Sequence, residues 1–157
     1  MCKCTVTALF PQKMVLNMSE SSMKHEGGCL CGAVRYEFLG EPVYSANCHC
    51  RSCQRAIGAG YVTWTAVKKE GFRVIKGEIT YCETSPGMHR GFCNQCGSSL
   101  EGHGDGWDEN YVTAASLDEP EIAKPTTNVY LDHQQPWVKI DEDLRCYKKF
   151  PEQSKEQ

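Results

Sequence analysis

The chain has 157 residues, which corresponds to one domain at roughly 150 residues per domain and suffices for a hydrophobic core. Hydrophobic residues make up 40% and charged residues 24%, the balance of a folded globular protein. The net charge of -3 argues against a protein built to hold nucleic acid or anionic lipid, and no apolar run approaches the roughly 20 residues of a membrane helix. Cysteine is the outlier, with 11 residues, and we look for the function there.

The two ends of the chain differ in composition from the middle. Residues 1–24 predict a flexible leader in which Cys2 and Cys4 are incidental thiols, and residues 151–157 predict a polar tail. The apolar stretch before Pro11 is too short for a signal peptide. We therefore expect a cytoplasmic protein, in which clustered thiols indicate metal ligands or redox groups.

The region 25–150 has the pattern of short β-strands. Alternating or β-branched and aromatic residues predict strands at 34–38, 61–67, 72–75, 79–82, 111–117 and 128–131. Lys76-Gly77-Glu78 predicts a tight hairpin between the third and fourth of these strands. Only 52–57 and 141–144 favour a helical turn or two. The sequence therefore predicts one mainly β domain with few short helices.

Seven of the cysteines fall into three closely spaced groups. The groups are Cys29 and Cys31, then Cys48, Cys50 and Cys53, and finally Cys93 and Cys96. In C-x-x-C a tight turn brings two sulfurs onto one metal ion, and in an extended C-x-C the two sulfurs share a face. Three such groups in one chain indicate a metal protein. Inert core cysteines, disulfides and a redox dithiol at Cys93 and Cys96 are weaker alternatives.

Counting the ligands predicts two zinc sites of different kinds. Seven thiolates make one closed four-sulfur site, which is structural, and one three-sulfur site with an open position for chemistry. Spacing permits two partitions, because Cys93 and Cys96 could be joined either by Cys50 and Cys53 or by the pair at 29 and 31. The second is favoured, because three ligands within six residues can close a site locally while the distant pairs clasp remote strands.

Longer stretches around these groups resemble a known family. The residues concerned are Gly27-Gly28-Cys29-Leu30-Cys31-Gly32-Ala33-Val34-Arg35-Tyr36, Cys48-His49-Cys50-Arg51-Ser52-Cys53, Gly60, Phe72, Gly77, Tyr81, Ser85-Pro86-Gly87, Phe92-Cys93-Asn94-Gln95-Cys96-Gly97, Leu117-Asp118 and Trp137. Together they resemble the glutathione-dependent formaldehyde-activating enzyme family, also called the centromere protein V family. The resemblance covers roughly residues 25–150.

The resemblance implies a fold, a ligand set and a reaction. The fold would be Mss4-like, with several small coiled antiparallel sheets organised around zinc. The structural zinc would be held by Cys29, Cys31, Cys93 and Cys96, and the catalytic zinc by Cys48, Cys50 and Cys53. The chain departs from the family at Asn128, where a His is frequent, and this puts the choice of substrate in doubt.

The open zinc site favours thiol chemistry over hydrolysis. Three thiolates leave a charge of about -1 on the site, which blunts the activation of water that three neutral histidines achieve. A thiol suits the site better, because zinc binds sulfur well and removes the thiol proton. The family name implies that glutathione and formaldehyde give S-hydroxymethylglutathione, and the reverse is a carbon–sulfur lyase step.

Other residues are weaker candidates. We expect His49 to point to solvent, His89 and His103 to be exposed loop residues, and Arg51, Arg55 and Arg90 to be ordinary solvated charges. The segment 102–107 predicts a flexible hairpin or substrate lip. Core or pocket positions are expected for the three tryptophans and for two single cysteines, which are Trp64, Trp107, Trp137, Cys82 and Cys146.

The sequence thus predicts a cytoplasmic carbon–sulfur lyase with two zinc ions per chain and a glutathione adduct as its small-molecule partner. Neither nucleic acid nor membrane is expected as a partner. The alternative is a non-catalytic, zinc-stabilised binding module associated with chromatin or the cytoskeleton, which centromere protein V relatives suggest. The acidic balance of charge and the lack of a basic extension argue against that alternative.

Overall fold

The computed structural model describes residues 4–5 and 23–151. The predicted leader at 1–24 and the predicted tail at 151–157 therefore lie almost entirely outside the described residues, and so does Cys2. Within the described part, no helix has the length and apolar composition needed to cross a membrane.

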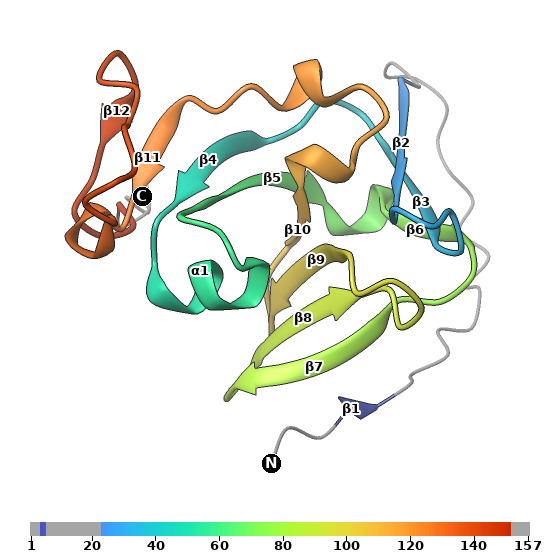
Figure 1. The fold of residues 1–157 in the computed structure, drawn as a ribbon. Helices are drawn as coiled ribbons and strands as arrows, with labels where there is room; N and C mark the ends of the chain where they lie inside the picture. Colours follow the sequence, from blue (N-terminus) through green and yellow to red (C-terminus); the bar gives the residue numbers. More distant parts are fainter. Residues whose placement is uncertain (1–3, 6–22, 152–157) are drawn as a thin grey trace.

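The described chain forms a nine-stranded sheet and a three-stranded sheet (Figure 1). The strands are β1 (Cys4–Thr5), β2 (Lys24–Gly28), β3 (Arg35–Leu39), β4 (Tyr44–Cys48), β5 (Val62–Lys68), β6 (Arg73–Lys76), β7 (Thr80–Ser85), β8 (Met88–Phe92), β9 (Ser99–Gly104), β10 (Glu109–Thr113), β11 (Thr127–Val129) and β12 (Arg145–Cys146). The helices are α1 (Arg51–Ile57) and the short 3₁₀ turns η1 (Lys69–Gly71), η2 (Ala114–Ser116), η3 (Pro120–Ala123) and η4 (Leu131–His133).

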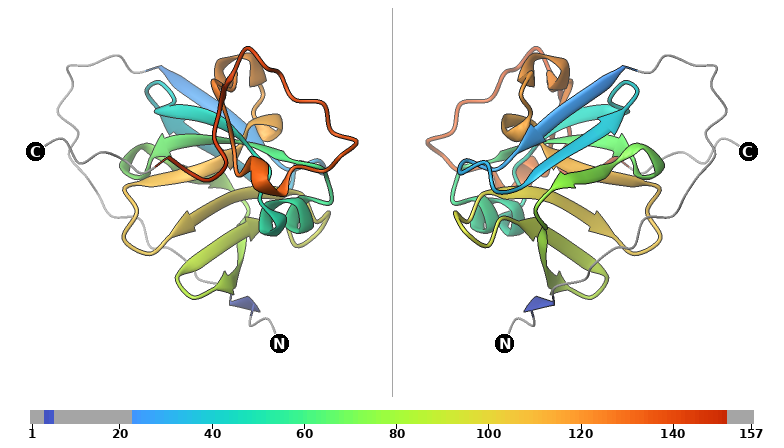
Figure 2. Two further views of the ribbon diagram at one scale, coloured as in Figure 1. Left: turned by 90° about the vertical axis from the view of Figure 1, so that its left-hand side faces the viewer. Right: turned by 90° about the vertical axis from the view of Figure 1, so that its right-hand side faces the viewer.

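The large sheet has the strand order β1-β7-β8-β9-β10-β5-β4-β11-β12, and the small sheet has the order β2-β3-β6. All neighbouring strands are antiparallel except β11, which runs parallel to both β4 and β12. The small sheet lies at one end of the molecule and β11 and β12 at the other, and Figure 2 views the molecule from these two ends. The prediction of a mainly β protein with antiparallel sheets and few short helices is confirmed.

Strand alternation gives the large sheet two different faces. Successive side chains of a strand point to opposite sides, so Trp64 and Val67 of β5 face opposite ways. Val67 packs in a core cluster with Val112 and with Tyr36 and Phe38 of the small sheet. Trp64 packs in a second cluster on the other face, whose buried members are Ala46, Cys48, Cys53, Val62, Trp64 and Val129.

The predicted hairpin through Lys76-Gly77-Glu78 is wrong. Strand β6 pairs with β3 in the small sheet, whereas β7 pairs with β8 and β1 in the large one. Gly77 has φ 67°, and a Cβ atom built there would lie 2.2 Å from the carbonyl oxygen of Ala33. The glycine therefore serves a crossing between sheets, where the backbone of a distant segment approaches closely.

Other predicted elements differ at their ends. The strand predicted at 111–117 ends at Thr113 and continues as η2, and the strand predicted at 128–131 ends at Val129. The helical segment predicted at 141–144 forms a turn, whereas the one at 52–57 is α1. In the predicted hairpin or lip at 102–107, residues 102–104 are the end of β9 and residues 105–107 belong to the connection to β10.

The crossing at Gly77 gives a test of this topology. Gly77 and Gly106 both have positive φ, at 67° and 74°, so alanine at either position costs about 1 kcal/mol of backbone strain. Only at Gly77 would the new Cβ meet a backbone oxygen, since no described atom lies within 4 Å of it at Gly106. We expect Gly77→Ala to lose at least about 2 kcal/mol more free energy of unfolding than Gly106→Ala, measured by urea denaturation. Equal losses in the two variants would contradict the close crossing.

Candidate metal centres

The four sulfurs of Cys29, Cys31, Cys93 and Cys96 lie together, all within 4.8 Å of one another. The Sγ atoms of Cys29 and Cys31 are 3.5 Å apart, and those of Cys31 and Cys93 are 3.9 Å apart. Cys29 and Cys31 come from the turn after β2, and Cys93 and Cys96 come from the turn after β8. In the chain, 62 residues separate Cys31 from Cys93. The four-sulfur group therefore joins the two sheets.

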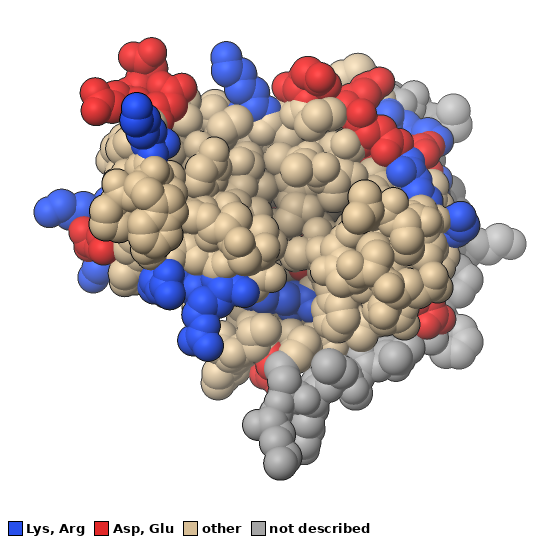
Figure 3. Space-filling view, in the orientation of Figure 1, with Lys and Arg blue, Asp and Glu red and all other residues tan. Residues whose placement is uncertain are grey.

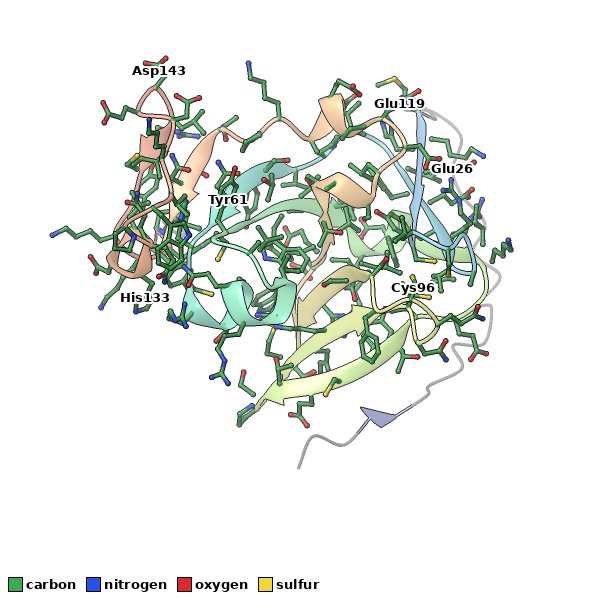
Figure 4. The ribbon with its side chains drawn as sticks, in the orientation of Figure 1. Glu26, Tyr61, Cys96, Glu119, His133 and Asp143 are labelled. Atoms are coloured by element: carbon green, nitrogen blue, oxygen red, sulfur yellow. The ribbon has the colours of Figure 1, made fainter. Side chains whose placement is uncertain are left out.

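Local hydrogen bonds hold the four-sulfur group in place. The backbone N–H of Val34 donates to the sulfur of Cys29 at 3.2 Å, and the N–H of Leu30 donates to the Ser98 hydroxyl at 3.1 Å. Hydrogen bonds from Ser98 lower the pKa of Cys96, which is labelled in Figure 4, to about 5. Donors of this kind favour the thiolate form that a metal requires.

The three sulfurs of Cys48, Cys50 and Cys53 form a separate group, also within 4.8 Å of one another. Cys48 ends β4, Cys50 is the N-cap of α1, and Cys53 lies in the first turn of that helix. The N–H of Cys53 donates to the Cys50 sulfur at 3.3 Å, so the start of the helix itself brings the sulfurs together. Cys48 and Cys53 are buried, and Cys50 is half-buried.

Two side chains from the large sheet contact the Cys53 sulfur. The indole N–H of Trp64 donates to it at 3.3 Å, and the guanidinium of Arg90 donates to it at 3.6 Å. Hydrogen bonds from Cys48 and Cys50, with further contributions from Trp64 and Arg90, lower the pKa of Cys53 to about 2. The neighbouring thiols and burial raise the pKa of Cys48 above its usual range. Trp64 and Arg90 thus stabilise negative charge on this group.

The four-sulfur group fits a tetrahedral zinc ion, and the three sulfurs of the other group lie within 4.8 Å of one another, close enough to share an ion. Zinc–sulfur bonds of about 2.3 Å in tetrahedral geometry place neighbouring sulfurs about 3.8 Å apart. The separations of 3.5 Å and 3.9 Å in the four-sulfur group bracket this value. The sulfurs are grouped as in the second of the two partitions that spacing permitted, and their role as ligands stays a prediction.

A cavity of about 590 Å³ adjoins the three-sulfur group and is lined by all three of its cysteines. Much of its wall is one face of the large sheet, because the pairing aligns Tyr44 with Ala66 and Tyr111, and then Tyr111 with Gly102 and Arg90. The four-sulfur group does not line this cavity. The two groups therefore differ in their access to a small molecule.

His49 is not the solvent-facing residue that we predicted. Its side chain is 1% exposed and stacks on Tyr61, labelled in Figure 4, with ring centroids 5.1 Å apart. Among the described residues neither ring nitrogen has a partner in hydrogen-bond geometry. Burial lowers the pKa of His49, and a weaker interaction with the Asn128 side chain opposes this shift. His49 does not line the cavity either. Because Cys48 and Cys50 share one face, the residue between them turns to the other.

The other predicted histidines lie on strands, not in loops. His89 of β8 and His103 of β9 stack on each other at 5.0 Å and bond to Asp105 and Glu101, respectively. Asn128, the departure from the family pattern, is buried and bonds to Asn47 and to the backbone of Asp141. Asn128 therefore stabilises the β4–β11 edge and does not reach the cavity.

Of the remaining predicted positions, some are confirmed and others are wrong. Arg51 and Arg55 are exposed on α1, as expected, but Arg90 lines the cavity. Trp64 and Trp107 also line the cavity, whereas Trp137 is 76% exposed. Neither single cysteine is a plain core thiol, since Cys146 is exposed and Cys82 is disulfide-bonded.

Sequence reasoning missed most of the cavity wall. The missed residues are Tyr44, Tyr111, Tyr130, Phe150 and the contact of Arg90 with Cys53. Part of this wall could have been found in the sequence, because Tyr44, Ala46 and Cys48 alternate with the polar residues Ser45 and Asn47. Strand pairing across β10, β5 and β4, which joins this stretch to Tyr111, is not encoded in any local pattern.

A mainly β domain with sulfur groups of zinc-ligand geometry defines a class of small metal-binding folds, and comparisons with known proteins narrow it. The family model for the glutathione-dependent formaldehyde-activating enzyme matches residues 24–133. The chain belongs to this family.

Three relatives are similar to the chain. A Halomonas elongata protein named "Putative glutathione-dependent formaldehyde-activating enzyme" is 32% identical over 143 residues, covering 82% of this chain and 90% of the relative. An "Uncharacterized lyase" of Schizosaccharomyces pombe is 25% identical over 125 residues, covering 79% and 84%. A crystal structure of a Rhodobacter sphaeroides protein aligns with a TM-score of 0.49 and 26% identity, covering 59% of this chain and 87% of that one.

The burial of His49 predicts the effect of replacing it. Phenylalanine keeps the ring stack on Tyr61 and removes two ring nitrogens that lack partners among the described residues. A buried polar group without a partner costs about 1–3 kcal/mol, so we expect His49→Phe to unfold at no lower urea concentration than the natural chain. A loss above about 1 kcal/mol would show instead that His49 donates or accepts a structural hydrogen bond.

Proposed function

We propose that the protein is a zinc-dependent carbon–sulfur lyase that forms and cleaves glutathione adducts of an aldehyde, such as S-hydroxymethylglutathione. Family membership, together with relatives named as an enzyme and as a lyase, supports a glutathione-related lyase. The zinc ions, the bond that is cleaved and the ligand roles are our proposals.

We assign the four-sulfur group to a structural zinc. The group joins segments that are 62 residues apart, and Cys93 is fully buried in the larger core cluster. A crosslink between distant segments restricts the unfolded chain, so metal binding there contributes directly to folding.

We assign Cys48, Cys50 and Cys53 to the catalytic zinc. The observation that carries this assignment is that the three-sulfur group lines a cavity of about 590 Å³, whereas the four-sulfur group does not. A three-ligand zinc site keeps a position for a substrate, and that position is of use only beside a space that admits one.

The reaction needs no oxidant or reductant. When bound, the zinc would supply affinity for sulfur and remove the proton of an incoming thiol. The thiol sulfur then bonds to the carbonyl carbon of an aldehyde, and the carbonyl oxygen takes up the proton that the thiol has lost. Cleavage is the reverse, with the same sulfur–carbon bond breaking.

The chain's own residues favour this reaction in two ways. The cavity holds the thiol and the aldehyde next to each other, which converts a bimolecular encounter into a local one. Trp64 and Arg90 donate to the Cys53 sulfur and so compensate part of the negative charge on the three thiolates. The alternative function, a non-catalytic binding module, has no use for a cavity that opens on three sulfurs.

The two metal assignments predict different outcomes for two equivalent substitutions. We expect Cys93→Ser to abolish cooperative folding, because its sulfur is buried where the sheets are joined. Cys50→Ser should lose one of two zinc ions and at least about 100-fold in activity while keeping its β-rich circular dichroism spectrum, since its group joins only the end of β4 to the start of α1. Elemental analysis measures the zinc content of each variant, and thermal unfolding measures its cooperative folding.

Cys146→Ser is the matched control for these two variants. Cys146 is exposed and belongs to neither sulfur group, so zinc content, fold and activity should all be retained. Equal loss of fold in the Cys50 and Cys93 variants would overturn the division into structural and catalytic sites.

Binding of glutathione to the zinc-loaded protein tests the thiol step. We expect zinc-edge X-ray absorption to report one added sulfur neighbour at one of the two zinc ions, and calorimetry to detect binding with proton release. Cys50→Ser is the control and should show neither signal. Calorimetric silence together with an unchanged zinc shell in the natural protein would favour the binding-module alternative.

A further inference from the structure

Aromatic side chains dominate the wall of the cavity beside the three-sulfur group. The aromatic lining residues are Tyr44, Trp64, Trp107, Tyr111, Tyr130 and Phe150. Val129, Ala46 and Met88 add further apolar surface, and the charged side chains of the lining are Arg90 and Glu109.

Contacts within the wall hold its aromatic rings together. The hydroxyls of Tyr44 and Tyr111 bond to each other at 2.7 Å, one donating and the other accepting. Trp107 packs edge-on against Tyr111 with ring centroids 5.1 Å apart. A Cβ atom at Gly104 would lie 2.4 Å from the indole of Trp107, so only glycine lets this ring lie against β9. Specific contacts therefore hold the aromatic rings of the wall in position.

The carbon side of a formaldehyde adduct is a single hydroxymethyl group, which offers no apolar surface to the aromatic wall. With formaldehyde alone, the aromatic wall would face water at a cost of roughly 25 cal/mol for each Å² left exposed.

Glutathione itself does not match the aromatic wall. It carries two carboxylates and one ammonium group, whose burial against aromatic rings would be unfavourable. Those charges suit the basic side: Arg90 stands beside the three-sulfur group, and Arg51 and Arg55 lie exposed on the adjoining α1. Figure 3 shows basic side chains gathered over the region of α1. The aromatic wall is therefore free to contact the group that the aldehyde contributes to the adduct.

We propose that the carbon side of the adduct carries an apolar group of about the size of an aromatic ring, so that the natural aldehyde is larger and more apolar than formaldehyde. This inference rests on the proposed function and specifies its substrate class. The thiol end of the adduct lies at the three sulfurs and its apolar group against Trp107 and Tyr111.

Stable thioethers of glutathione test the proposal without turnover. S-benzylglutathione and S-methylglutathione differ only in the group that would meet the wall. We expect the benzyl compound to bind the zinc-loaded protein at least tenfold more tightly by calorimetry, which corresponds to about 1.4 kcal/mol. Equal affinities, or tighter binding of the methyl compound, would overturn the proposal.

Two tryptophan variants locate the effect. Trp107→Ala removes one wall of the cavity and should reduce the benzyl preference at least fivefold, with little change in binding of the methyl compound. Trp137→Ala is the matched control, because Trp137 is 76% exposed and does not line the cavity. An unchanged preference in the Trp107 variant would place the benzyl group elsewhere and contradict the assignment.

A second wall variant covers the case in which Trp107→Ala does not fold. A Cβ at Gly102 would lie 3.4 Å from the His89 carbonyl oxygen and 3.7 Å from the Trp64 ring, which are ordinary contacts. Gly102→Ala should therefore fold and narrow the cavity, lowering affinity for the benzyl compound at least threefold and for the methyl compound less. No change in either affinity would contradict the proposed position of the ring.

Exchange NMR separates this proposal from the proposed function. At equilibrium with glutathione, the protein should accelerate sulfur–carbon exchange of phenylacetaldehyde at least tenfold more than that of formaldehyde. Faster exchange of formaldehyde would overturn the substrate class and leave the lyase function intact. No acceleration of either aldehyde, with no binding of either thioether, would overturn the lyase function itself.

Discussion

Side-chain alternation in one continuous sheet is the constraint on which the site depends. Tyr44, Ala46 and Cys48 share a face of β4, and strand pairing brings Trp64 and Tyr111 onto the same face. The three-sulfur group and the cavity wall therefore occur together, while the opposite face packs against the small sheet. A one-residue slip of β4 would exchange these faces and place the sulfur of Cys48 in the wrong core.

The two sulfur groups differ in chain separation, and they therefore differ in how much of the topology depends on them. Cys31 and Cys93 are 62 residues apart, so bringing them together defines how the two sheets meet. The group at 48–53 joins only the end of β4 to the start of α1. The four-sulfur group therefore carries more of the topology, although Cys31 is exposed and Cys96 half-buried, whereas the three-sulfur group lines the cavity.

Local patterns predicted β3, β5, β6, β7, β10 and β11 but missed β2, β4, β8, β9 and β12. Long-range pairing accounts for the failed hairpin and for the environment of His49. The alternation at 34–38 and the helical signal at 52–57 appear as β3 and α1. The hairpin failed because Gly77 serves a close approach to Ala33, 44 residues earlier in the chain, which no local rule detects. His49 failed because its environment includes Tyr61, brought next to it by the fold.

The metal ligands of the site come from a local motif, whereas the cavity wall that would select a substrate comes from long-range strand pairing. The three sulfurs come from one short motif whose spacing alone brings them together. The wall comes from β4, β5, β8, β9 and β10 and from the segments around Tyr130 and Phe150, which no short motif connects. Substitutions in that wall can change the space offered to a substrate without displacing a sulfur. Membership in a family defined by its cysteine motifs therefore constrains the metal chemistry more strongly than it constrains the carbon side of the adduct.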